Sequence, residues 1–209
     1  MVWTSDHGGT RWYAVLAVFV LVVVMVATLF SGRQLTAAYV ADDVLVGGWG
    51  ENLLERVAET RLFGLEQWVS FTYEIDDSYP ASLTVTTMTT PVMMNEQELR
   101  NQMINTIQQQ AEKGIIIDQA SEETGERLLN NSHQTIYVRY CGNDTSTTPA
   151  EEIKIIGEAW NCGISGTSVL CIGVAQVSDF AHSVTAKNTE RWETIVGDKN
   201  GLIFNVICH

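Results

Sequence analysis

Four cysteines are the residues of this chain whose chemistry depends most on their location. They are Cys141, Cys162, Cys171 and Cys208, all in the last third of the sequence. An even number of cysteines in a domain outside the cytoplasm is typical of disulfides. Cys162 and Cys171 flank an expected turn, and a disulfide closing their loop would contribute on the order of 2–3 kcal/mol. Cys141 with Cys208 would fasten the C-terminus. Four cysteines allow three connectivities, so the other pairings stay open.

Metal binding and cysteine catalysis are alternative uses of the same thiols. Structural zinc sites usually take ligand pairs at short spacing, such as C-x2-C. No such pair is present, because Cys162 and Cys171 are nine residues apart and Cys208 is followed directly by His209. No C-x-x-C redox motif occurs either. The sequence therefore predicts no metal site and no cofactor.

A serine nucleophile would have to be Ser165, in the sequence GISGTS. That stretch lacks the G-x-S-x-G elbow of the serine hydrolases. His133, His182 and His209 could supply a base, but no spacing ties any of them to a serine or a carboxylate. His133 is expected at the surface beside a glycosylation sequon. No catalytic residue is predicted.

Paired acids and tryptophans are the remaining candidates for a site. The pairs Asp42-Asp43, Asp76-Asp77 and Glu151-Glu152 fall at expected turns or element ends, where solvated carboxylates are common. No EF-hand loop appears. A glycosidase would need two carboxylates facing each other across a cleft, which only the fold can arrange. The four tryptophans after residue 30 are expected in the core: Trp49, Trp68, Trp160 and Trp192.

An uncharged apolar stretch of 19 residues, 12–30, precedes all of these residues. It is about as long as a helix needs to be to cross a bilayer. We predict a short tail over 1–11, a transmembrane signal anchor over 12–31, a juxtamembrane linker over 32–47 and a domain over 48–209. A cleaved signal ending near Ala38 is the first alternative. A pilin-like leader is the second, although no basic residue precedes the glycines of HGGTRW.

The flanking arginines do not decide on which side of the membrane the domain lies, because Arg11 and Arg33 balance each other. The even cysteine count favours the outside. Two N-x-[ST] sequons, at Asn130 and Asn143, favour it too and make these residues glycosylation candidates. We therefore expect a single-pass membrane protein whose C-terminal domain lies outside the cytoplasm.

The clearest helix of the domain is expected after Asn95. Asn95 and Glu98 form a capping-box pattern, and Leu99, Met103 and Ile107 continue an apolar stripe at four-residue spacing. Gly114 is expected as the C-cap. A shorter second helix is expected over 188–197. The segment 44–65 is ambiguous between helix and strand.

Alternating segments predict an antiparallel sheet. A hairpin is expected from 68–75 and 81–88, with further strands over 115–120, 133–141, 151–160, 167–177 and 202–208, and a polar turn at 124–125. Two helices packed on such a sheet make an α+β domain. This element order resembles that of PsbP-type α/β/α sandwiches; the resemblance concerns topology and implies no function.

The charge of the chain excludes one class of partner. After residue 34 there are 24 acidic and 10 basic residues, a net charge of −14. Such a surface repels phosphate, so no nucleic-acid partner is expected. We predict a membrane-anchored extracytoplasmic domain with a binding or assembly role in the cell envelope, whose possible partner is another envelope protein. The alternative is a surface-exposed hydrolase whose site is assembled only in the fold.

Overall fold

A computed structural model describes residues 15–25, 35–75, 80–111, 114–146, 148, 150–177 and 186–209. Residues 15–25 form a helix within the predicted anchor, whose ends lie outside the described residues. Across the described ranges, no helix combines the length and the apolar character that a membrane crossing requires. Asp76, Asp77 and His182 also lie outside the described residues.

The domain is built on an antiparallel sheet, which confirms the predicted α+β class. The described residues give eight strands in the order β2-β4-β5-β9-β8-β7-β6, with β3 paired to β4 beside β2. The strands of this sheet are β2 (Gly50–Glu51), β3 (Val57–Arg61), β4 (Glu66–Ile75), β5 (Ala81–Thr89), β6 (Ile115–Leu128), β7 (Gln134–Asp144), β8 (Glu151–Cys162) and β9 (Thr167–Gln176).

The predicted hairpin is confirmed as β4 and β5, which pair from Gln67↔Thr89 to Ile75↔Ala81. Leu83 and Val85 on β5 are fully buried on one face. The opposite face of the same two strands carries hydroxyl pairs, of which Ser70 Oγ and Thr86 Oγ1 lie 2.9 Å apart. The ambiguous segment 44–65 contains β2, β3 and two short 3₁₀ helices, η1 (Leu53–Glu55) and η2 (Leu62–Gly64).

Helix α2 (Glu96–Ala111) covers one face of the sheet. Its predicted capping box is confirmed: the Asn95 N–H donates to Glu98 Oε2 (2.8 Å), and the Glu98 N–H donates to Asn95 Oδ1 (3.0 Å). The stripe Leu99, Met103 and Ile107 is buried against β7, β8 and β9.

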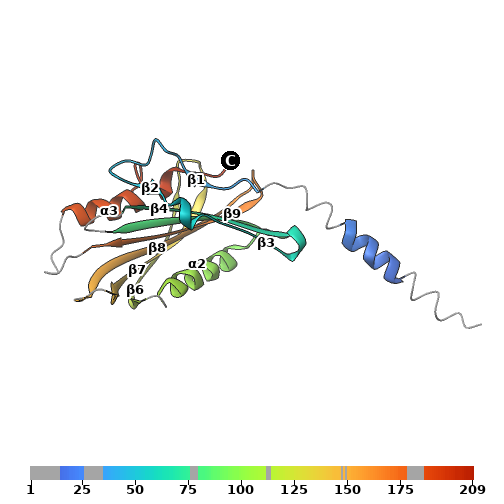
Figure 1. The fold of residues 1–209 in the computed structure, drawn as a ribbon, viewed down its shortest axis with the longest axis horizontal. Coiled ribbons are helices and arrows are strands. Elements are labelled where there is room, and N and C mark those ends of the chain that lie inside the picture. The colour runs from blue at the N-terminus through green and yellow to red at the C-terminus, as the bar shows by residue number, and fades with distance from the viewer. Residues whose placement is uncertain are drawn as a thin grey trace, which may run out of the picture.

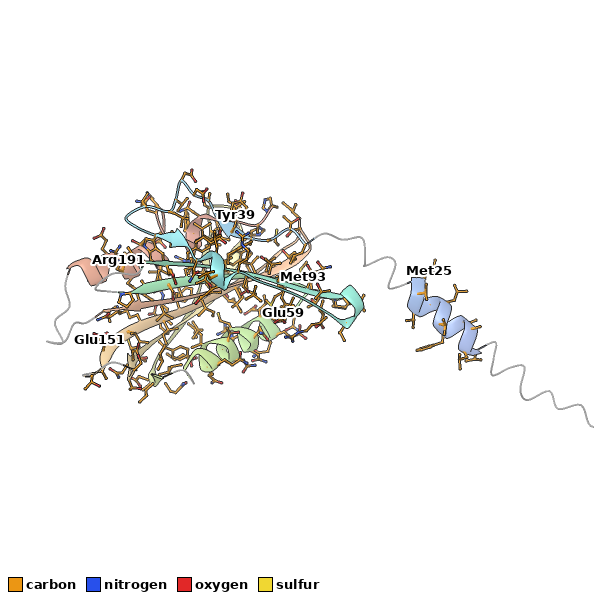
Figure 2. All side chains as sticks on the ribbon, viewed as in Figure 1. Met25, Tyr39, Glu59, Met93, Glu151 and Arg191 are labelled. Atoms are coloured by element: carbon orange, nitrogen blue, oxygen red, sulfur yellow. The ribbon has the colours of Figure 1, made fainter. Side chains whose placement is uncertain are left out.

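Helix α3 (Ala186–Val196) covers the opposite face (Figure 1). Trp192, Ile195 and Val196 are buried in the second core cluster, as their spacing predicts. Side chains fill the space between the sheet and both helices (Figure 2). The sheet is therefore the middle of three layers.

A buried ion pair lies on the α3 face of the sheet. The Glu158 side chain is fully buried, and its Oε2 accepts from Arg127 Nη2 at 2.6 Å. Thr135 Oγ1 donates to Glu158 Oε1 at 2.6 Å, and Arg127 also donates to the carbonyl of Val196 at the end of α3. This network joins β6, β7, β8 and α3.

Two elements differ from the sequence-based expectation. No turn forms at 124–125; β6 runs on to Leu128 with a register shift between Asp118 and Glu123. Gly125 lies within that strand, at a position where Tyr137 occupies the space that a side chain would need. The segment expected as a terminal strand forms η3 (Ile203–Asn205) and only then the two-residue β10 (Val206–Ile207).

The first and last strands of the described domain pair with each other. β1 (Tyr39–Val40) and β10 form a separate two-stranded sheet. Ala38 and Val40, which belong to the predicted juxtamembrane linker, are buried in the core. The Val40 N–H donates to the Tyr73 hydroxyl at 2.9 Å, and the Ala38 N–H donates to Thr87 Oγ1 at 2.7 Å.

Candidate binding groove and the cysteine cluster

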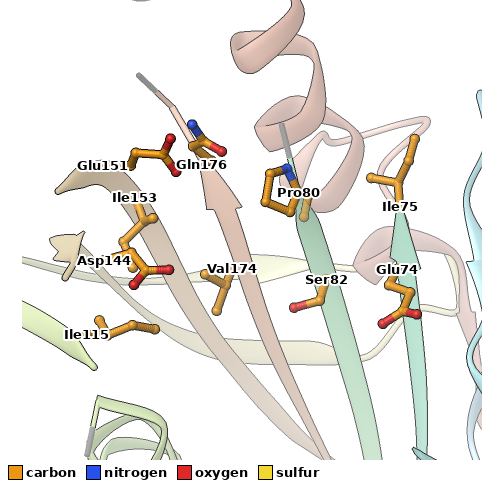
Figure 3. A pocket seen from close by; sticks show the side chains of 11 residues that line it. Glu74, Ile75, Pro80, Ser82, Ile115, Asp144, Glu151, Ile153, Val174 and Gln176 are labelled. Atoms are coloured by element: carbon orange, nitrogen blue, oxygen red, sulfur yellow. The ribbon is translucent and has the colours of Figure 1, made fainter. Parts of the chain in front are cut away.

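A groove of about 340 Å³ opens at one end of the sheet, where β4, β5, β6, β7, β8 and β9 contribute its lining residues (Figure 3). Ile153 and Val174 line it, and Ile153 belongs to the apolar cluster under α2, against which Val174 packs. None of its described lining residues comes from α2. The groove is thus a part of the sheet face that this helix leaves open.

Three carboxylates line the groove. Figure 3 shows Asp144 and Glu151 on one side and Glu74 on the other, with Val174 between them. No Lys, Arg or His is among its described lining residues. Glu151 lies at the start of β8, an element end as predicted, and contributes to the groove. The groove combines an apolar floor with an acidic rim.

The residue that hydrogen-bonds Glu74 on the rim is followed in the sequence by exposed apolar side chains. Glu74 Oε1 accepts a hydrogen bond from Asn52 Nδ2 at 3.0 Å, and the side chain of Asn52 also caps the short helix η1. Leu53 and Leu54 in η1 are 68% and 96% exposed. A ligand that is both cationic and partly apolar would match these features.

The predicted disulfide pairs are wrong, because all four cysteines are free. Cys171 lies opposite Glu158 in the β8–β9 register, four residues from the row of Cys162, or roughly 13 Å along the strand. Cys141 is eight residues along β7 from His133, roughly 27 Å, whereas Cys208 lies near His133. Both pairs are therefore too far apart to bond.

The structure instead brings Cys162 and Cys208 together with two histidines. One donor atom from each of His133, Cys162, Cys208 and His209 lies within 4.8 Å of the other three. His209 Nδ1 is 3.5 Å from Cys162 Sγ and 3.4 Å from Cys208 Sγ. These are the described residues best placed to hold a metal ion. His133, expected at the surface, is half-buried in this cluster.

The surroundings of the three buried cysteines shift their thiol pKa values in different directions. Burial alone would raise the pKa of Cys162, but hydrogen bonds from Ser165, Cys208 and His209 outweigh it and lower the value to about 7. Burial and the hydrogen bond with Cys162 raise the pKa of Cys208 to about 12. Burial, and then the charge of Glu158, raises the pKa of Cys171 well above its usual range.

Within the part of the chain that the structure describes, the other candidate residues do not assemble a catalytic site. Ser165 lies in the β8–β9 turn, and its Oγ is 2.7 Å from Thr167 Oγ1; within the described ranges no hydrogen bond joins it to a histidine. Both sequon asparagines, Asn130 and Asn143, are exposed, and Asn130 Nδ2 donates to Asn205 Oδ1 at 3.3 Å. Their glycosylation stays a prediction.

The tryptophans are core residues, as expected. Trp49, Trp160 and Trp192 are buried, and Trp68 is half-buried at the edge of the cluster under α2. They therefore do not form an exposed stacking platform.

A scan against protein-family models and searches of curated proteins and of solved structures each found no match to this chain. The topological resemblance to PsbP-type sandwiches thus stays one of element order. Function has to be argued from the groove and the clustered side chains.

Proposed function

We propose that this protein is a non-catalytic binding or assembly module that docks a cationic, partly apolar segment of an envelope protein. The observation that carries the proposal is the groove with Glu74, Asp144 and Glu151 around Ile153 and Val174. A Lys or Arg side chain fits such a place well, since its charged head meets the carboxylates while its aliphatic stem covers the apolar floor.

The proposal keeps the location predicted from the sequence, which now rests on the two N-x-[ST] sequons, because all four cysteines are free. The domain stands outside the cytoplasm on one membrane helix within 12–31, and its acidic surface keeps it away from anionic lipid. The alternative of a surface hydrolase has less support, since no histidine is among the described residues that line the groove.

Peptide binding to the solubilised full-length chain tests this function. The probes are a short synthetic peptide that alternates Lys with Leu, and the same peptide with Glu in place of Lys. We expect only the Lys peptide to bind, with an affinity that falls as salt rises, because screening weakens attraction between exposed charges. Calorimetry at low and high salt measures both effects.

Charge reversal locates the binding site. The double variant Glu74→Lys/Glu151→Lys should weaken binding of the Lys peptide by about tenfold or more. Glu193→Lys is the control, since Glu193 is exposed on α3, across the sheet from the groove. Equal affinities for the two variant proteins, or no binding of the Lys peptide to the unaltered protein, would refute the docking function.

A further inference from the structure

Three parts of the chain meet at the end of the sheet opposite the groove. The antiparallel β7–β8 register pairs Ile136 with Ala159. Extending this register by three residues, backward from Ile136 and forward from Ala159, brings His133 opposite Cys162. The C-terminal segment after β10 brings Cys208 and His209 to the same place. The cluster is thus fixed by strand pairing on one side and by the returning chain on the other.

We propose that His133, Cys162, Cys208 and His209 bind one Zn²⁺ ion in a closed, structural site. Zinc takes Cys and His ligands in tetrahedral geometry, with bonds of about 2.3 Å to sulfur and about 2.0–2.1 Å to nitrogen. These bond lengths place a ligand sulfur and a ligand nitrogen about 3.6 Å apart. The two distances from His209 Nδ1 to sulfur in the structure, 3.5 and 3.4 Å, match this spacing.

The burial of the donors favours a metal ligand over a nucleophile. The Cys162 and Cys208 side chains are 0% and 1% exposed, so a substrate would not reach either sulfur. His133 Nε2 is also buried and has no hydrogen-bond partner among the described residues. A buried polar atom without a partner is costly, and a metal bond would satisfy it. Four protein ligands leave no open position, as in structural rather than catalytic zinc sites.

Asn131 holds the cluster in place from the β6–β7 turn. Its Oδ1 accepts from the His133 N–H at 3.1 Å, and its Nδ2 donates to the Val206 carbonyl at 3.0 Å. The same Nδ2 lies 3.8 Å from Cys208 Sγ, where it can donate to a metal-bound thiolate. Asn131 is a positioning residue of the kind that surrounds metal ligands.

Binding would involve no redox step. Each thiol that is still protonated loses its proton to solvent, its sulfur lone pair forms a bond to zinc, and each neutral imidazole donates a lone pair. The ion would then fasten the C-terminal segment to the β6–β7 turn and to the end of β8.

Cobalt and zinc titration of the solubilised full-length chain tests the site. The protein is purified with reductant, treated with chelator and titrated with Co²⁺ without oxygen. We expect one equivalent to give the visible bands of tetrahedral cobalt and a sulfur-to-cobalt charge-transfer band, and one equivalent of Zn²⁺ to remove both. Cys162→Ser and His133→Gln should weaken metal binding at least a hundredfold.

Two further variants keep the result decisive. His209 is exposed, so His209→Gln should keep the fold, judged by circular dichroism, and still weaken metal binding at least tenfold. Cys141→Ser, which removes a thiol far from the cluster, should leave metal binding unchanged. The same loss in Cys141→Ser, or a Cys162–Cys208 disulfide found by alkylation and intact mass in the protein as isolated, would overturn the proposal. Lys-peptide binding does not depend on these cysteines, so the two proposals fail separately.

Discussion

Tyr73 ties the N-terminal segment to the sheet through one buried hydroxyl. Its side chain is 2% exposed and accepts the Val40 N–H. Burial is the main cause that raises the Tyr73 pKa from 10.0 to about 12, although the Val40 hydrogen bond acts against it. The folded state therefore holds the phenol proton more tightly than the unfolded chain does.

This pKa shift predicts how the stability depends on alkaline pH. The contribution of Tyr73 is fully present below pH 10 and is lost as the pH rises from 10 toward 12. Urea unfolding across this range should show a falling free energy of unfolding, with a smaller fall in Tyr73→Phe. Tyr140, whose pKa is also raised to about 12 by burial and Glu122, keeps part of the slope in that variant. Identical slopes in both proteins would contradict the assignment to Tyr73.

The clustered side chains show what residue patterns alone do not predict. The even cysteine count predicted disulfides, yet Cys162 and Cys171 lie on adjacent strands four residues out of register. The ligands meet only because β7 pairs with β8 and the C-terminus returns to them. The adjacent Cys208 and His209 were the one local signal, since two donor residue types next to each other offer a metal two ligands.

At the scale of elements, α2 can approach the sheet closely because β8 has a glycine beneath it. A side-chain carbon added at Gly157 would overlap Met103 Cγ, so that the Met103 side chain or the helix itself would have to shift. Gly157→Ala should therefore lower the free energy of unfolding by about 1–3 kcal/mol, the usual cost of overpacking. Urea unfolding measures the change.

Gly163→Ala is the matched control for this prediction, because the same added carbon finds nothing within 4 Å there. We expect its effect to stay within about 0.5 kcal/mol. If Gly157→Ala unfolds at the same urea concentration as Gly163→Ala, the helix does not depend on this contact.

Local patterns predicted the elements better than they predicted the chain ends. The capping box of α2, the hairpin and the apolar face of α3 each follow from contacts within a few residues, and all three are confirmed. The sequence pattern of the C-terminal segment predicts a strand. In the structure, however, the side chain of Asn205 donates from Nδ2 to the carbonyls of Lys199 and Gly201, which holds a short 3₁₀ helix there. The groove was missed because the order of the strands in the sheet has to be known before Glu74 of β4 and Glu151 of β8 can be placed on either side of it.

At the scale of the whole molecule, the net charge of −13 should make stability depend on salt. Like charges repel in the compact state, and the screening length falls from about 30 Å at 0.01 M salt to about 3 Å at 1 M. We expect the melting temperature to rise by about 2–8 °C over this range, or roughly 1–2 kcal/mol for a chain of this size. Differential scanning calorimetry in NaCl checks it.

The shape of that salt curve separates screening from general salt effects. Screening should saturate as the salt approaches about 1 M, whereas exclusion of salt from the protein surface continues to rise. A melting temperature that is constant or falls with salt would show that the acidic surface does not destabilise the folded state.

The pairing of β1 with β10 also determines how the domain would respond to tension. A pull that enters from residue 35 reaches Ala38 first and then Tyr39 and Val40, whose one strand partner among the described residues is β10. The eight-stranded sheet shares that load through the two side-chain acceptors Thr87 and Tyr73. Under force this two-residue pair of strands would separate before the longer strand pairs of the sheet. Its separation would relieve the tension while the sheet and its groove stay folded.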